Sequence, residues 1–92
     1  MPKLFKVGAF SIFFWSNELG EPIHVHVCVG NPYANSTKIW LTQGGGALVA
    51  HNKSRIAKHD LAEILVVIQV NFDIICKAWK EHFDIDNIEF YC

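Results

Sequence analysis

This chain has little of what marks several common classes of protein. Its formal net charge is only −1, from eight basic and nine acidic residues, so it lacks the clustered basic surface with which proteins hold phosphate backbones. It has no run of the roughly 18 apolar residues that a bilayer span needs. Its first residues also lack the long apolar segment of a signal peptide. We therefore expect a cytoplasmic protein that uses no membrane and that charge alone does not attach to nucleic acid.

Cysteine is scarce and widely spaced. The chain has three, Cys28, Cys76 and Cys92, and they form no Cys-x-x-Cys pair of the kind found in zinc and redox sites. An odd number at wide spacing fits a reducing compartment. Cys28 and Cys76 stand in apolar runs, so we expect both to be buried as small apolar residues.

Apolar and aromatic residues, in contrast, are plentiful. Hydrophobic residues make up 51% of the 92 positions, with seven Phe, three Trp and two Tyr. A chain of this length forms one small domain, and this composition gives it a core without metals or disulfides. It also leaves apolar surface for a partner, either another small protein or a second copy of the chain.

The first half of the chain predicts strands. Apolar alternation or β-branched and aromatic enrichment marks four segments: residues 7–15, 23–29, 36–42 and 47–51. The first is apolar on both faces, which indicates an interior strand whose outer face is also covered, for instance by a second copy. Alternation of Ile88, Phe90 and Cys92 predicts a last strand within residues 84–92.

The second half predicts a helix. From Lys58 to Phe83, apolar residues recur at steps of three and four, which is the spacing of one helix face. We expect either one long helix or a helix broken near Asn71. The predicted fold is therefore α+β, an antiparallel sheet of three to five strands with one long C-terminal helix packed on one face.

Two histidines follow a polar turn. The turn Ser16–Glu21 and Pro22 lead into a strand-like segment in which His24 and His26 are separated by one residue. Side chains at i and i+2 of a strand point to the same face. The imidazoles should therefore share one face, opposite the aliphatic side chains of residues 23, 25 and 27.

This pair has three interpretations. His24 and His26 could ligate one divalent metal ion such as zinc, iron or manganese, with a third ligand still to be chosen from Glu18, Glu21, Cys28, His51 and His59. They could instead be neutral side chains hydrogen-bonded within the fold, or they could act as catalytic acid and base with Glu18. Asn17, Glu21 and Trp40 are candidate binding residues, and Trp40 shares the face of the histidines if the second and third predicted strands pair.

At these residues the chain resembles a bacterial and archaeal family of small proteins called domain of unknown function 4160. The likeness covers residues 7–83 and includes Ser-Asn-Glu at 16–18, Glu-Pro-x-His-x-His-Val at 21–27, Lys-x-Trp-Leu at 38–41, and Ala78, Trp79 and Phe83. Two features depart from the family pattern. Ile23 replaces a second proline, and a triple glycine at 44–46 replaces a more ordered turn.

The resemblance implies a compact sheet-and-helix domain but no established activity. It also implies a neighbouring small gene, with which such proteins have been proposed to form toxin–antitoxin modules. We therefore expect a protein-interaction module, and the resemblance implies a role as one component of a toxin–antitoxin-type pair. The alternative is a small metal- or histidine-dependent hydrolase or nuclease that uses His24 and His26.

Overall fold

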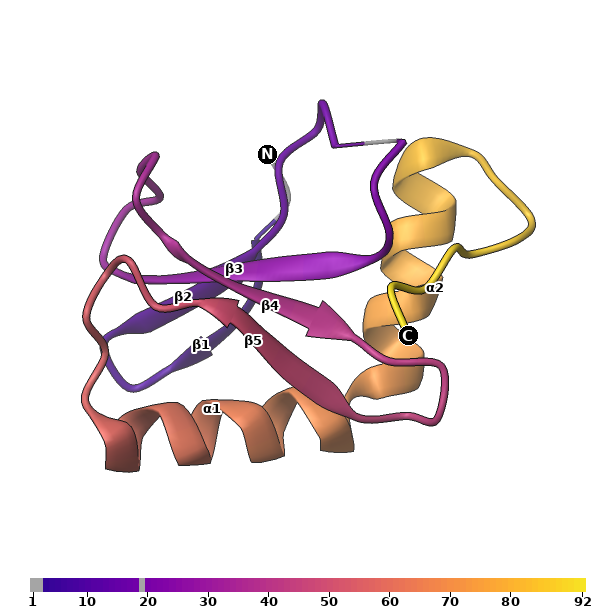
Figure 1. The fold of residues 1–92 in the computed structure, drawn as a ribbon. Coiled ribbons are helices and arrows are strands. Elements are labelled where there is room, and N and C mark those ends of the chain that lie inside the picture. Colours follow the sequence, from indigo (N-terminus) through magenta and orange to yellow (C-terminus); the bar gives the residue numbers. More distant parts are fainter. Residues whose placement is uncertain (1–2, 19) are drawn as a thin grey trace.

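The protein is an α+β domain built on a five-stranded antiparallel sheet with the strand order β1-β2-β3-β4-β5. A computed structural model describes residues 3–18 and 20–92 (Figure 1). The strands are β1 (Lys3–Val7), β2 (Phe10–Phe13), β3 (His24–Val29), β4 (Thr37–Leu41) and β5 (Ala47–His51), and the helices are α1 (Lys58–Val70) and α2 (Phe72–Phe83). The predicted α+β class with an antiparallel sheet is confirmed, as are three of the five predicted strands.

The prediction of a single strand over residues 7–15 is wrong. A hairpin divides this stretch, because Val7 pairs with Phe10 across the two residues Gly8 and Ala9. Gly8 has φ +59°, a conformation that glycine adopts without steric penalty at the first central position of a tight hairpin turn. The prediction that β2 is an interior strand is confirmed, since it lies between β1 and β3.

One face of the sheet carries the hydrophobic core. Opposed residues of antiparallel strands lie on the same face, so the pairs Ile12↔Val27 and Val25↔Ile39 place four fully buried aliphatic side chains together. Ile64 and Ile68 from α1 pack against this face. The alternation of β3 therefore sends its valines into the core and its histidines to the opposite face.

The predicted single long C-terminal helix is wrong, because the structure has two helices with the break at Asn71, the alternative that the sequence left open. The Asn71 side-chain amide donates to the Val67 carbonyl at 2.9 Å, and the residue leaves helical geometry at φ −103°, ψ 20°. Asparagine disrupts helices in this way because its side chain competes for backbone partners. Figure 1 shows α1 running across the sheet and α2 rising at the end where β3 begins. Among the described residues, no helix is long and apolar enough to cross a membrane.

The predicted strand within residues 84–92 is also wrong. Asp84 ends α2 in the left-handed region at φ 53°, and the segment after it has no regular strand. Two backbone hydrogen bonds attach this segment to the end of the sheet instead. The Ile23 amide donates to the Glu89 carbonyl, and the Gln43 amide donates to the Cys92 carbonyl. The alternating apolar residues of the segment serve packing, because Phe90 stacks on Phe72 of α2.

The three cysteines are free thiols at different depths. Cys28 is buried as predicted, whereas Cys76 is only half-buried and Cys92 is exposed. The prediction of a buried Cys76 is therefore only partly correct.

Candidate functional site

β3 places two imidazoles side by side on the face away from the core. The His24 and His26 ring centroids lie 5.0 Å apart at an interplanar angle of 90°. The exposed fraction is 0% for His24 and 8% for His26. The predicted sharing of one face is confirmed, and both rings are almost completely removed from solvent.

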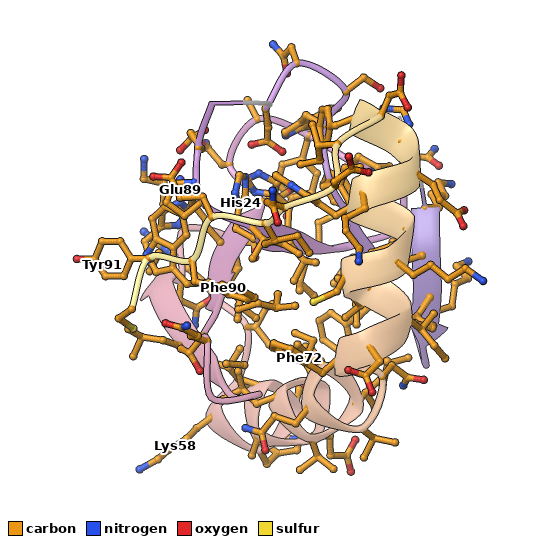
Figure 2. The ribbon with its side chains drawn as sticks, turned by 90° about the vertical axis from the view of Figure 1, so that its right-hand side faces the viewer. His24, Lys58, Phe72, Glu89, Phe90 and Tyr91 are labelled. Carbon is orange, nitrogen blue, oxygen red and sulfur yellow. The ribbon has the colours of Figure 1, made fainter. Side chains whose placement is uncertain are left out.

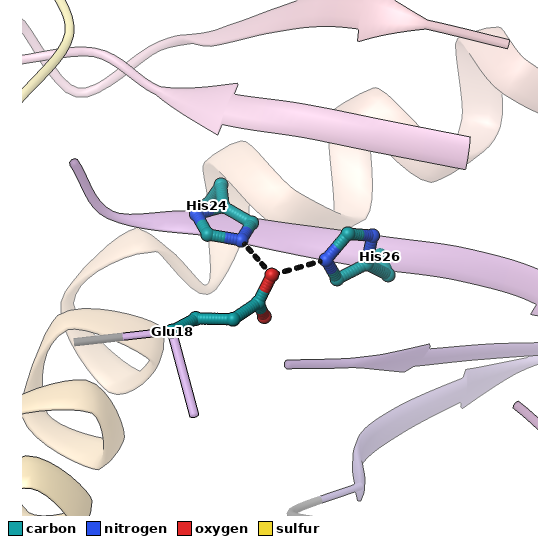
Figure 3. Close-up of side chains that lie close together, drawn as sticks. All are labelled: Glu18, His24 and His26. Atoms are coloured by element: carbon teal, nitrogen blue, oxygen red, sulfur yellow. Dashed lines mark hydrogen bonds and ion pairs between the residues drawn. The ribbon is translucent and has the colours of Figure 1, made fainter. Parts of the chain in front are cut away.

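Glu18 joins the two rings. From the connection between β2 and β3, its Oε2 atom lies 2.6 Å from His24 Nε2 and 2.8 Å from His26 Nε2 (Figure 3). Its other oxygen, Oε1, accepts a hydrogen bond of 2.7 Å from the Trp15 backbone amide. The carboxylate is thus held at three points, and its exposed fraction is only 9%.

Aromatic rings enclose this cluster. Phe13 stacks on His26 with centroids 5.6 Å apart, and Trp40, which pairs with His24 across the sheet, lies 5.5 Å from the His24 ring. The predicted position of Trp40 on the histidine face is confirmed. Trp79 of α2 also lies 5.5 Å from His24, a contact that local sequence pattern does not predict because it depends on the direction of α2.

The hydrogen bonds determine where the protons of His24 lie. Its Nδ1 atom is 2.8 Å from the Pro22 carbonyl oxygen, which can only accept, so Nδ1 carries a proton. Its Nε2 faces the Glu18 carboxylate, so both ring nitrogens of His24 lie against acceptors. His26 donates from Nε2, and its buried Nδ1 atom has no partner among the described residues.

The environment keeps Glu18 ionised. Burial acts to raise the pKa of its carboxyl, but hydrogen bonds from His24, His26 and the Trp15 amide, together with the His24 charge, lower it from the ordinary 4.5 to about 2. Such bonds stabilise the carboxylate and not the acid. A charged carboxylate therefore persists in a nearly dry, aromatic environment.

The other candidate ligands do not join the cluster. Glu21 pairs with Lys38 at 2.8 Å, and the Cys28 thiol lies against the backbone carbonyl of Asn31 at 3.5 Å. His59 is exposed beside Asp60. Within the described residues, the side chains that could share one metal ion are Glu18 and the two histidines.

The remaining candidates also lie outside the cluster. Asn17 is exposed at the turn and His51 is half-buried on β5. The binding and catalytic roles assigned to the candidate residues stay predictions. Two participants had no signal in the sequence, namely the Trp15 amide and the Pro22 carbonyl, because both are backbone groups.

Acid should destabilise the protein through Glu18. Because the pKa falls from 4.5 unfolded to about 2 folded, the unfolded state binds more protons between these values. The stabilisation is complete above pH 4.5 and is lost as the pH falls towards 2, a change of about 3 kcal/mol. Urea denaturation of wild type, Glu18→Gln and Glu21→Gln across this range measures it. Only Glu18→Gln should flatten the dependence, and equal slopes for all three proteins would contradict the assignment.

Comparison with known proteins places this site within a family. The comparison with curated proteins found no match, and the comparison with solved structures found none. A family model described as "Domain of unknown function (DUF4160)" matches residues 9–80, a stretch that includes Glu18, both histidines and Trp79. The match covers most of the chain, so this protein belongs to the DUF4160 family, as its motifs indicated.

Proposed function

We propose that this domain is a protein-interaction module whose contact surface is the outer edge of β5 together with the aromatic side chains beside it. β5 is the last strand of the sheet, so one row of its backbone donors and acceptors faces no neighbouring strand. Natural edge strands are usually protected by lysine, proline or a bulge. β1, the opposite edge, carries Lys3 and Lys6, whereas β5 has the sequence Ala-Leu-Val-Ala-His, without lysine or proline. Its one irregularity lies between Val49 and His51, where its register with β4 shifts by one residue.

An aromatic patch adjoins this edge. Leu48 of β5 pairs with Trp40 of β4, and Tyr91 stacks on Trp40 with centroids 4.8 Å apart and planes 5° apart. Leu48 is 45% exposed and Tyr91 is 59% exposed, and Figure 2 shows Tyr91 projecting from the molecule. Tryptophan and tyrosine dominate the binding energy of many interfaces. This stacked pair beside an edge strand without lysine or proline is the observation that carries the proposal.

The occupant that fits best is a second copy of the chain. β5 contains no acidic or basic residue other than His51. Burial lowers the pKa of His51 and the charge of Lys53 lowers it further, so the strand is uncharged at neutral pH. Two such strands can pair antiparallel about a two-fold axis at Val49 without like charges meeting. The two sheets would then join into one.

Sedimentation equilibrium over a wide concentration range tests this proposal. The expected mass is twice the 10.4 kDa of one chain. Leu48→Lys should shift the protein to the monomer, because it places a like charge on both sides of the new strand pair. Val66→Lys is the matched control, since Val66 is 59% exposed but lies on α1. A monomer at every concentration would contradict the proposal, as would equal effects of the two variants.

The toxin–antitoxin interpretation makes a distinct prediction at the same surface. A strand from a second small protein, encoded beside this one, would take the place of the second copy. If the chain is a monomer and binds that protein only while Leu48 is intact, the partner at this surface is that protein and not a second copy.

The hydrolase or nuclease alternative stays a hypothesis. Its proposed acid and base have exposed fractions of 0% for His24 and 8% for His26. A substrate could reach them only if the connection carrying Glu18 moved away from the sheet. No specific observation favours that movement.

A further inference from the structure

We propose that Glu18, His24 and His26 together bind one divalent first-row transition-metal ion, with Zn²⁺ as the representative. The three donor atoms, one from each residue, lie within 4.8 Å of one another. They come from two elements, the β2–β3 connection and β3 itself. The site adjoins the β5 contact surface through Trp40, which lies 5.5 Å from His24 and pairs with Leu48, but none of its three ligands belongs to that surface.

The chemistry of the three facing atoms supports a cation. Figure 3 shows both Nε2 atoms directed at one carboxylate oxygen of Glu18, at 2.6 and 2.8 Å. A carboxylate oxygen and a neutral imidazole nitrogen both present lone pairs, and lone pairs repel unless a positive species lies between them. Protons can fill that position, and so can a metal ion. Metal binding here would displace the Nε2 protons of both histidines.

The surrounding hydrogen bonds already match those of a metal site. Metal-bound histidine usually donates its other ring nitrogen to a backbone carbonyl or carboxylate, which fixes the ring and its tautomer. His24 does so from Nδ1 to the Pro22 carbonyl at 2.8 Å. The carboxylate is fixed in turn by the Trp15 amide on Oε1, which leaves Oε2 for the metal. Two of the three ligands are therefore oriented by groups behind them.

The adjustment needed for a metal is small. Ligand atoms about 2.0–2.1 Å from a tetrahedral zinc ion are about 3.3 Å apart, compared with 2.6 and 2.8 Å between Glu18 and the histidines. Glu18 must therefore retreat by about half an ångström. It lies in a connection rather than in a strand, and Gly20, two residues further on, has φ +110°. The three donor atoms span up to 4.8 Å, so the two imidazole rings must also turn toward the ion to reach this spacing.

The donor set identifies the class of ion. Two imidazoles and one carboxylate suit zinc, and the same set with open positions suits iron(II). Magnesium and calcium prefer oxygen ligands throughout. The aromatic rings of Phe13, Trp40 and Trp79 shield the site from water, which strengthens the attraction between a cation and the carboxylate.

Calorimetric titration with Zn²⁺ tests the proposal on protein purified without a histidine tag and treated with a chelator. We expect one ion per chain. Glu18→Gln should weaken binding by more than the roughly 10–100-fold that loss of an outer-shell partner costs. Glu21→Gln is the matched control, because it removes a carboxylate from the same connection without touching the cluster, and it should leave the affinity unchanged.

A second measurement on the wild type keeps the test valid if Glu18→Gln fails to fold. Co²⁺ should give the visible absorption of a site with nitrogen and oxygen ligands and no thiolate band. Absence of stoichiometric Zn²⁺ binding to the folded wild type would overturn the proposal. Equal Zn²⁺ affinities for folded Glu18→Gln and Glu21→Gln would also overturn it, as would a Co²⁺ thiolate band, which would point to Cys28.

Discussion

Replacing Glu18 with alanine is expected to lower the free energy of unfolding by about 3–5 kcal/mol, because removal of one member of a buried pair leaves its partner unpaired. The unpaired group would be His24, which has no exposed surface and two nitrogens that face acceptors. A domain of this size has a total stability of about 5–15 kcal/mol, so the variant would lie near the limit of folding. Urea denaturation at neutral pH with a chelator present, followed by circular dichroism, measures the loss.

The matching control is Glu21→Ala, which removes a carboxylate paired with Lys38 at the surface and should change the stability by less than about 1 kcal/mol. A double-mutant cycle separates pairing from simple burial. If Glu18 and His24 act as a pair, the double variant Glu18→Ala/His24→Ala should lose less stability than the two single variants added together. Strict additivity would show that the buried pair is not the reason for the loss.

Trp79→Ala is expected to have an effect of similar size, about 3–5 kcal/mol. Trp79 is 1% exposed, and its ring lies 5.0 Å from Phe14, 4.6 Å from Phe83 and 5.5 Å from His24. Deleting it would leave a cavity where α2 meets the end of the sheet, and it would also remove one wall of the histidine site. Denaturation followed by far-ultraviolet circular dichroism measures the change without using tryptophan fluorescence.

Two further variants serve as comparisons for Trp79→Ala. Trp79→Phe keeps most of the apolar volume and should recover a large part of the loss. Trp40→Ala removes a ring of the same size from the partly exposed outer face and should cost less. Equal losses for Trp79→Ala and Trp40→Ala would contradict the view that α2 is anchored by a buried tryptophan.

Where sequence reasoning failed, it lacked long-range information or overlooked a local turn. Gly8 is the one signal that could have divided residues 7–15 into two strands, since glycine with positive φ is typical of a two-residue hairpin. The last nine residues alternate as a strand does, but each backbone bond to the sheet depends on where α2 ends. Alternation of apolar and polar residues indicates which side chains are buried, but it does not require continuous hydrogen bonding to a neighbouring strand.

The choice of Glu18 over Glu21 also required the folded chain. Both carboxylates lie in the same turn, three residues apart, and both were candidates for the third ligand. The Trp15 amide holds Glu18 over the sheet, whereas Lys38, which pairs with His26 across β3 and β4, draws Glu21 outward. These partners are distant in sequence or belong to the backbone, so local pattern could not rank them.

Local pattern was sufficient for β3, β4 and β5 and for the shared face of the two histidines, and it offered the break at Asn71 as one of two alternatives. Each of these follows from side-chain periodicity or from the preference of one residue, and both act over a few neighbours. The convergence of Glu18 with His24 and His26, and the approach of Trp79, depend on strand pairing and on the direction of α2. Contacts of that kind are chosen by the packing of the whole core, which minimises buried unpaired groups over the entire chain.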